Sequence, residues 1–381
     1  MIDRIVDLTD EEARAALPMK WGQVADGILP AWVAEMDYAV APAITEALTR
    51  AVARGLTGYP DERPGGELGE AYAAFAKRHF GHAVDADQVL ATVDVTAGVR
   101  IALDVFAERA PVVLPLPAYP PQLEVVPVAG RERWDLPVDP DGPYALDLDE
   151  LDRMFARGAR TLLLTQPHNP CGHVYTRAEL EGIRDVVVRH GARVISDEIH
   201  APLVLPGAEH VPYLSLDGTA DHAVAVVSAS KAFNIPGLRC AQLVTADPEL
   251  HRILAAAPHV TNDSWSPLGV VAAIAAYADG DGWLAALIER LDAQRTLLGR
   301  LLAEHLPRAR MRPMDATYLA WLDLRDYGHD DPAAVALERG RVYVSTGTAF
   351  QPDLPGHVRL NLATSPERLT EAVRRLGTAL G

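Results

Sequence analysis

The sequence predicts an α/β fold built on a mostly parallel β-sheet with helices on both faces. Between about residues 89 and 247, short apolar runs alternate with segments of helical periodicity. The runs are apolar without interruption, which is typical of strands that are buried on both faces. Because strands and helices alternate, we expect crossover connections between parallel strands.

Six strands are expected in this part of the chain. They lie at residues 89–93, 112–114, 161–164, 194–195, 223–227 and 241–244. A helix is expected over residues 99–108. A second helix should begin after Thr176, because Thr176 and Glu179 form a capping-box pattern, and Gly191 is placed to end it.

The two ends of the chain lie outside this alternation. After about residue 266 a long helical tract runs to residue 300, and an α+β segment occupies about residues 308–381. The first 45 residues do not follow the strand–helix pattern either. We therefore expect a large domain over residues 46–275 and a smaller α+β domain built from residues 1–45 and 276–381.

Composition excludes several classes of protein. The chain has 381 residues, of which 49% are hydrophobic and 23% charged, so it is globular rather than disordered. With a net charge of −17 and no run of Lys or Arg, we expect no nucleic-acid partner. The longest apolar stretch, residues 268–278, is too short for a bilayer, and no signal peptide is visible. We expect a cytoplasmic protein without a membrane partner.

Several familiar binding motifs are also missing. The two cysteines, Cys171 and Cys240, and the histidines lack zinc-site spacing, so no metal centre is expected. The sequence has no GxGxxG after its first strand, no GxxxxGK[ST] and no GxSxG. What remains is a set of polar residues after successive strands, where open α/β sheets place their ligand sites.

One of these polar groups is the segment Ser-Ala-Ser-Lys at residues 228–231. Burial or a neighbouring cation would lower the pKa of Lys231, as a Schiff-base nucleophile requires. Ser228, Ser230 and Arg239 are suited to bind a phosphate. Taken alone, the segment also fits a surface lysine in a turn.

Two further groups precede the lysine in the chain. Asp197 ends an apolar run, where a buried carboxylate needs a cation such as a protonated pyridine nitrogen, although a turn or helix cap is the alternative. Asn169 lies in an Asn-Pro-Cys-Gly segment, which is also an ordinary turn signature. Asp197 follows Asn169 by 28 residues, and Lys231 follows Asp197 by 34. In this order, the three groups indicate one constellation.

Seven segments together carry a resemblance to a known family. They are Leu-Pro-Ala-Trp-Val-Ala-Glu-Met-Asp (29–37), Gly-Tyr (58–59), Pro-Ala-Tyr (117–119), Pro-His-Asn-Pro (167–170), Ser-Asp-Glu-Ile-His (196–200), Ser-Lys-Ala-Phe-Asn (230–234) and Val-Arg-Leu-Asn-Leu-Ala (358–363). The chain resembles the fold-type I pyridoxal-phosphate enzymes of the aminotransferase class I/II superfamily. More narrowly, it is similar to the cystathionine β-lyase, or cysteine-S-conjugate β-lyase, branch. The resemblance spans nearly the whole chain and implies a seven-stranded sheet and pyridoxal 5′-phosphate as cofactor.

The resemblance implies a role for each residue of the constellation. Lys231 would bind the cofactor covalently and move protons at the substrate Cα. Asp197 would pair with the pyridine nitrogen, and Asn169 would donate a hydrogen bond to the 3-oxygen. Tyr119 would stack on the ring. His200 stands three residues after the aspartate, where many transaminases carry a tyrosine, and its role stays open.

The resemblance also implies a phosphate site and a substrate site. The phosphate would be bound by Gly98 and Val99 at a helix start, and by Ser228, Ser230 and Arg239. Tyr59 would reach it from a neighbouring subunit, so a homodimer is expected. On the substrate side, Arg359 would take the α-carboxylate in a bidentate pair and Ala34 would border the substrate.

The sequence departs from the family pattern at three positions. Cys171 stands where Thr is commoner, Glu35 where Asp is frequent, and Ala97 where Pro is often found. None of the three removes a group that the cofactor chemistry needs. They leave the identity of the substrate open.

Three functions are compatible with these residues. The first is α,β-elimination from cystathionine or another S-substituted L-cysteine, giving a thiol, pyruvate and ammonia. The second is transamination, which would use the same residues. The third, of another class, is a non-catalytic regulatory or interaction protein on the same fold. The motifs alone do not separate them, because fold does not identify substrate.

Overall fold

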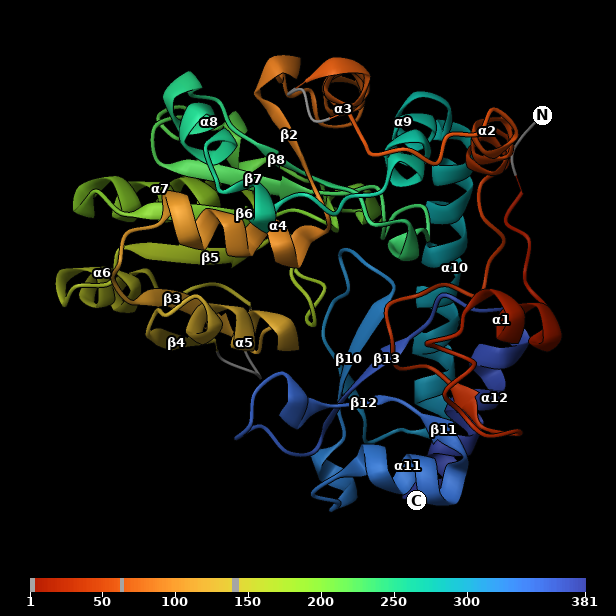
Figure 1. Ribbon diagram of the computed structural model, residues 1–381. Coiled ribbons are helices and arrows are strands. Elements are labelled where there is room, and N and C mark those ends of the chain that lie inside the picture. Colours follow the sequence, from red (N-terminus) through yellow and green to blue (C-terminus); the bar gives the residue numbers. More distant parts are fainter. Residues whose placement is uncertain (1–3, 62–64, 139–143) are drawn as a thin grey trace.

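The large β-sheet is the frame on which the polar segments are arranged. The computed structural model describes residues 4–61, 65–138 and 144–381. In these residues the sheet has seven strands in the spatial order β2-β8-β7-β6-β5-β3-β4 (Figure 1). They are β2 (Val89–Thr92), β3 (Val112–Leu116), β4 (Arg133–Pro137), β5 (Thr161–Thr165), β6 (Arg193–Asp197), β7 (Ala223–Val227) and β8 (Ala241–Val244). Only β8 runs antiparallel to its neighbours, so the predicted mostly parallel sheet is confirmed.

The central strands bury side chains on both faces of this sheet. In β5, Leu163 packs in one hydrophobic core, whereas Leu162 and Leu164 pack in the other. Helices α4 (Val95–Ile101), α5 (Pro120–Val128) and α8 (Pro248–Ala255) contribute to the core around Leu163. Helices α6 (Leu148–Ala156) and α7 (Arg177–His190) cover the opposite face. Two-sided burial explains why the strands are apolar throughout.

Local capping decides where the helices begin and end. In α7 both halves of the capping box form between Thr176 and Glu179, and Gly191 ends the helix with φ +59°, as predicted. In contrast, α4 starts at Val95 rather than near residue 99, because the Asp94 carboxylate accepts a hydrogen bond from the Ala97 N–H (2.8 Å).

A second, antiparallel sheet lies toward the C-terminus, in the order β12-β13-β10-β9 (Figure 1). Its strands are β9 (Arg310–Met311), β10 (Leu319–Asp323), β12 (Ser345–Thr346) and β13 (His357–Asn361). Near it, β1 (Leu29–Pro30) pairs in parallel with β11 (Val342–Tyr343). Strand β1 therefore joins the N-terminal segment to the C-terminal part of the chain.

The remaining helices connect these parts. The α-helices are α1 (Asp10–Ala16), α2 (Pro42–Ala53), α3 (Gly66–Phe80), α9 (Pro267–Asp279), α10 (Asp281–His305), α11 (Pro332–Gly340) and α12 (Pro366–Leu380). Short helical segments are η1 (Ala86–Gln88), η2 (Ala102–Phe106), η3 (Ala201–Leu203), η4 (Tyr213–Ser215), η5 (Pro236–Leu238), η6 (His259–Thr261), η7 (Arg325–Tyr327) and η8 (Gly347–Ala349). No single helix of the described residues could cross a membrane by length and hydropathy; α9 and α10 would do so only as a pair, bent by 80°.

A buried ion pair ties the N-terminal segment into the molecule. Lys20 Nζ lies 2.9 Å from Asp37 Oδ1, and both side chains are fully buried. The Asp37 N–H donates to the carbonyl of Ala363, and Arg290 pairs with Asp7 (2.8 Å). Both ends of the chain thus meet in one region. The boundaries expected at residues 45 and 276 stay a prediction.

Candidate active site

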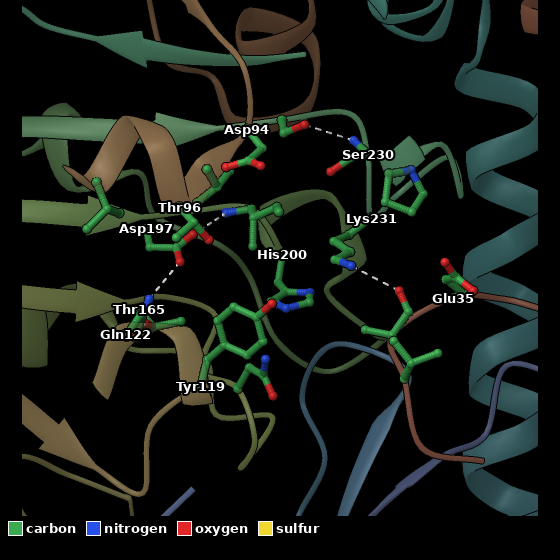
Figure 2. Close-up of a pocket in the computed structure, with 18 of the residues that line it drawn as sticks. Glu35, Asp94, Thr96, Tyr119, Gln122, Thr165, Asp197, His200, Ser230 and Lys231 are labelled. Atoms are coloured by element: carbon green, nitrogen blue, oxygen red, sulfur yellow. Dashed lines mark hydrogen bonds between the residues drawn. The ribbon is translucent and has the colours of Figure 1, made fainter. Parts of the chain in front are cut away.

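One cavity, of about 310 Å³, collects the polar residues that follow the strands of the large sheet (Figure 2). Residues after β3, β5, β6 and β7, and just before β8, line it together with part of the N-terminal segment. Ten of the residues predicted for the site border this cavity, namely Ala34, Val99, Tyr119, Asn169, Asp197, His200, Ser228, Ser230, Lys231 and Arg239. The fold therefore brings most of the predicted set to one place.

Asp197 ends β6 with its carboxylate buried in this cavity. The side-chain amide of Gln122 donates to Oδ2 (2.8 Å), and the N–H of Ile199 donates to Oδ1 (3.2 Å). Burial raises the pKa of Asp197 to about 7, although both hydrogen bonds act in the opposite direction. A buried carboxylate of this kind suits a cationic partner.

Lys231 lies in the loop after β7, facing the N-terminal segment across the cavity. Its Nζ donates to the carbonyl oxygen of Ala34 (3.0 Å), which also accepts a bond from the Tyr318 hydroxyl (3.0 Å). Burial lowers the pKa of Lys231 to about 8; Glu35 opposes this shift, and Arg359 adds to it. An appreciable fraction of the amine is therefore neutral near pH 7, as a nucleophile requires.

His200 and Tyr119 line the same cavity (Figure 2). Burial, together with the positive charges of Lys231 and Arg359, lowers the pKa of His200 to about 3, so the ring is neutral. Its Nδ1 is buried and has no hydrogen-bond partner among the described residues. Burial raises the pKa of Tyr119, which keeps its hydroxyl protonated.

Arg359, on β13, lies next to the cavity and contacts it through Asn169. Its Nη1 donates to Asn169 Oδ1 (3.0 Å) and its Nη2 to the carbonyl of Trp32 (2.8 Å), while the guanidinium lies over Phe350. Because arginine only donates, it holds the amide oxygen of Asn169 and leaves the amide N–H groups as donors for a ligand. The Nε of Arg359 is buried and has no partner in the described chain.

The helix start predicted at Gly98 and Val99 needs correction. Helix α4 begins three residues earlier, and the Gly98 N–H already donates to the Asp94 carbonyl (2.9 Å). In the first turn of α4, the residues that border the cavity are Val95 and Thr96, whereas Val99 lines it from the next turn. Gly98 has another role, because a Cβ there would lie 2.7 Å from Val226 Cγ1.

The hydroxyl of Ser228 also acts differently from the prediction. It donates to the carbonyl of Cys240 (2.8 Å) and accepts from the Ser230 N–H (3.1 Å), so it shapes the loop rather than offering a free donor. Arg239, half of whose side chain or more is exposed, pairs with Asp94 at the edge of the cavity. Ser230 and Arg239 remain positioned for an anion.

Tyr59 lies outside the cavity of its own chain. Its side chain is 96% exposed, on the segment between α2 and α3. The structure of a single chain therefore does not bring it to the other predicted residues.

Several residues of the site escaped the sequence analysis. Gln122 is the main one; its position three residues after Tyr119, on the same face of α5, is the signal that could have found it. Asp94 precedes an apolar helix as an N-cap and could have been found by that pattern. No sequence signal marks Tyr318, which lies just before β10 of the second sheet.

The residues in the cavity fit pyridoxal phosphate. Asp197 is a buried carboxylate that needs a cation, and Lys231 is an amine with a lowered pKa. The orphaned Nδ1 of His200 and the free amide N–H groups of Asn169 provide polar partners for a ligand. Ser230 offers a hydroxyl donor and Arg239 a guanidinium at the edge of the cavity, and both groups suit a phosphate.

Comparisons with known proteins agree with this fit. A family model described as aminotransferase class I and II matches residues 33–376. A Mycobacterium leprae protein, provisionally named a cystathionine beta-lyase, is 40% identical to this chain. The alignment covers 98% of this chain and 97% of that one. The cystathionine beta-lyase of Corynebacterium glutamicum is 34% identical, covering 97% of this chain and 98% of its own.

A solved structure extends the likeness to three dimensions. It is the crystal structure of a protein from Corynebacterium diphtheriae, provisionally described as a PLP-dependent beta-cystathionase. The TM-score is 0.93 at 35% sequence identity, and the match covers 99% of both chains.

Proposed function

This chain belongs to the aminotransferase class I and II family, and on that premise we propose that it is a pyridoxal-phosphate-dependent carbon–sulfur β-lyase. It would act on cystathionine or another S-substituted L-cysteine. The observation that carries the proposal is the cavity that Lys231 and Asp197 line together, an amine and a carboxylate that are both buried there. The names of the relatives support lyase chemistry over other reactions of the family.

The chemistry divides between the cofactor and the residues of the chain. Pyridoxal phosphate, when bound, supplies an aldehyde that takes up amines and a ring that accepts an electron pair from the substrate Cα. Lys231 would hold the cofactor, and its amine would take the proton from Cα. Asp197 would keep a proton on the ring nitrogen. Asn169 would donate to the 3-oxygen, Ser230 would donate to the phosphate, and Arg239 would offset its charge.

Substrate binding falls to Arg359 and the N-terminal segment. The guanidinium of Arg359 binds the α-carboxylate, which fixes the Cα–H bond relative to Lys231. The carbonyl of Ala34 accepts a hydrogen bond from Lys231 Nζ (3.0 Å) and would hold this amine whenever it is not attached to the cofactor. The overall change balances: S-substituted cysteine and water yield the thiol, pyruvate and ammonium.

The test is a panel of S-substituted L-cysteines, including cystathionine, incubated with the reconstituted protein. We expect pyruvate and free thiol in equal amounts, without any added 2-oxo acid. Lys231→Ala should reduce the rate by a factor of at least 10³, because it removes both the attachment point and the base. Borohydride reduction of the wild-type protein should fix the pyridoxyl group on Lys231.

The family model keeps transamination as the competing function. If turnover requires a 2-oxo acid and yields no thiol, the chain is an aminotransferase and the lyase proposal is wrong. If the protein binds no pyridoxal phosphate at all, both enzymatic proposals fail.

We also propose that the active form is a homodimer in which each chain supplies Tyr59 to the other chain's cavity. The support is the exposure of this aromatic ring, 96%, in a single chain, close in sequence to the exposed Val52 of α2. Large exposed aromatic side chains commonly mark protein–protein contacts.

Mixing inactive variants tests this arrangement. Heterodimers of Lys231→Ala and Tyr59→Ala chains contain one cavity with both defects and one with neither, so activity should return on mixing and subunit exchange. If both variants are inactive and the mixture stays inactive despite exchange, Tyr59 acts within its own chain and the proposal fails.

A cytoplasmic location is the last part of the proposal. Cys171 and Cys240 are both buried, free thiols, which suits a reducing compartment. Cell fractionation should recover the protein with cytoplasmic markers.

A further inference from the structure

We propose that Gln122 is a positioning residue that keeps the carboxylate of Asp197 ionised and directed at the ring nitrogen of the cofactor. The inference rests on the proposed function, because it concerns the cofactor that Asp197 would hold. It adds a residue that lies outside the segments on which the family resemblance depends.

Gln122 lies in the first turn of α5 and is 4% exposed. Its Nε2 donates to Asp197 Oδ2 at 2.8 Å, as Figure 2 shows. Its Oε1 accepts a bond from the hydroxyl of Thr165 at 2.9 Å. Thr165 and Asp197 are direct neighbours on the paired strands β5 and β6. The three side chains therefore form one buried relay from Thr165 through Gln122 to Asp197.

The side-chain amide of Gln122 has only one favourable orientation in this relay. A flipped amide would point its oxygen at the carboxylate, bringing two acceptors together. In the observed orientation, the Thr165 hydroxyl donates to the amide oxygen of Gln122, and the amide N–H of Gln122 donates to Asp197. Such a donor favours the ionised carboxylate over the protonated acid.

The surroundings of Asp197 make its ionisation depend on this donor. Burial favours the protonated acid, and the neighbouring Glu198 acts in the same direction. Lys231, across the cavity, favours the ionised form, and the hydroxyl of Tyr119 at the start of α5 faces the same space. The hydrogen bonds from Gln122 and from the N–H of Ile199 counteract the effect of burial, because they stabilise the ionised carboxylate of Asp197. Without Gln122, the shared proton would shift from the ring nitrogen toward Asp197.

The test follows the ring nitrogen itself. Wild type and Gln122→Met are reconstituted with ¹⁵N-labelled pyridoxal phosphate, and the ¹⁵N chemical shift is recorded between pH 6 and 9. We expect a protonated nitrogen in the wild type. In Gln122→Met the ¹⁵N shift should move toward that of a neutral ring nitrogen at every pH in this range, because the proton passes to Asp197 within the pair and is not lost to solvent.

Two threonines of β5 supply matched variants. Thr165→Val removes the donor that orients Gln122, so it should move the ¹⁵N shift in the same direction by less. Thr161→Val, at the other end of β5, removes an equally buried hydroxyl that has no partner in the described residues, and it should leave the ¹⁵N shift unchanged. If Gln122→Met does not fold, Thr165→Val carries the test, because valine is nearly isosteric with threonine.

A measurement without cofactor separates this inference from the proposed function. In the cofactor-free protein, Gln122→Met should raise the pH at which Asp197 ionises, read from the pH dependence of unfolding against an Asp197→Asn background. Equal ¹⁵N profiles and equal ionisation of Asp197 in wild type and Gln122→Met would overturn the role of Gln122. Failure of the wild type to bind pyridoxal phosphate would instead overturn the proposed function.

Discussion

At the scale of single residues, the lysines of this chain occupy three different environments. The sequence contains only Lys20, Lys77 and Lys231. Lys20 is buried in its ion pair with Asp37, Lys77 is exposed on α3, and Lys231 faces the cavity. Chemical labelling can therefore report on Lys231 with little background.

We predict that Lys231 in the cofactor-free protein reacts with an amine-directed acylating reagent with a midpoint near pH 8, because burial lowers its pKa to about 8. Peptide mass spectrometry measures the rate at each pH, with Lys77 as internal reference. Glu35→Gln should lower the midpoint, since Glu35 stabilises the ammonium form. A midpoint above pH 10 for Lys231 would contradict the geometry of the cavity.

Asp197 provides a second measurement at this scale, through stability. Its pKa is raised from 3.8 to about 7 in the folded protein. The folded state therefore holds this proton more tightly than the unfolded state, so the contribution is complete below about pH 4 and is lost as the pH rises toward 7. Asp197→Asn lacks this dependence.

The free energy of unfolding of the cofactor-free wild type, measured relative to Asp197→Asn, should thus fall by about 3 kcal/mol between pH 4 and 7. Urea titrations at a series of pH values measure it. Adding pyridoxal phosphate should restore stability to the wild type more than to Asp197→Asn, because only the wild type offers the ring nitrogen a carboxylate. Parallel pH profiles for the two proteins would show that Asp197 is not buried as described.

At the scale of elements, the close approach of α4 to the sheet sets where the cavity wall lies. A Cβ at Gly98 would lie 2.7 Å from Val226 Cγ1 and 3.3 Å from Thr92 Cγ2. Any side chain at Gly98 therefore pushes α4 away from β7. The same movement would displace Val95 and Thr96 from the cavity.

We predict that Gly98→Ala lowers the free energy of unfolding by about 1–3 kcal/mol and weakens pyridoxal phosphate binding. Adding Val226→Ala should recover part of the loss by making room for the methyl group. Gly299→Ala is the matched control, since Gly299 lies in α10 with open space around it, and it should stabilise the protein by up to about 1 kcal/mol. The prediction fails if Gly98→Ala and Gly299→Ala behave alike.

At the scale of the whole molecule, the N-terminal segment joins the C-terminal part of the chain to the loop after β7 that carries Lys231. Its strand β1 pairs with β11, and its Ala34 carbonyl accepts a hydrogen bond from the amine of Lys231. The buried pair of Lys20 and Asp37 holds this segment, and Trp21 Nε1 donates to the same Asp37 oxygen at 2.7 Å. Residues 33–35 of the N-terminal segment thus form part of the cavity wall.

Lys20→Met should therefore cost about 3–5 kcal/mol of stability, because it leaves the Asp37 carboxylate buried without a cation. The double variant Lys20→Met with Asp37→Asn should be more stable than the single one, since a neutral amide oxygen still accepts from Trp21. Denaturant unfolding measures both, and cofactor affinity should fall with stability as Ala34 loses its support. A double variant less stable than Lys20→Met alone would refute this account.

The sequence alone predicted most of the large sheet. Six of its strands were located because burial on both faces makes each run apolar, which is a local property. Strand β4 (Arg133–Pro137) was missed, since it lies at the edge of the sheet and carries polar side chains. The start of α4 was misplaced because the cap at Asp94 was not recognised.

By itself, the sequence determined the identity and order of Asn169, Asp197 and Lys231, because strand ends are local features and parallel strands end at one edge of a sheet. Only the tertiary structure decided what each group contacts. Gln122 donates a hydrogen bond to Asp197, Tyr318 donates one to the Ala34 carbonyl, and the N–H of Gly98 is used within its own helix. Hydrogen bonds and desolvation act between atoms that packing brings together from distant parts of the chain. The distances between these atoms cannot be predicted from the local sequence around each residue.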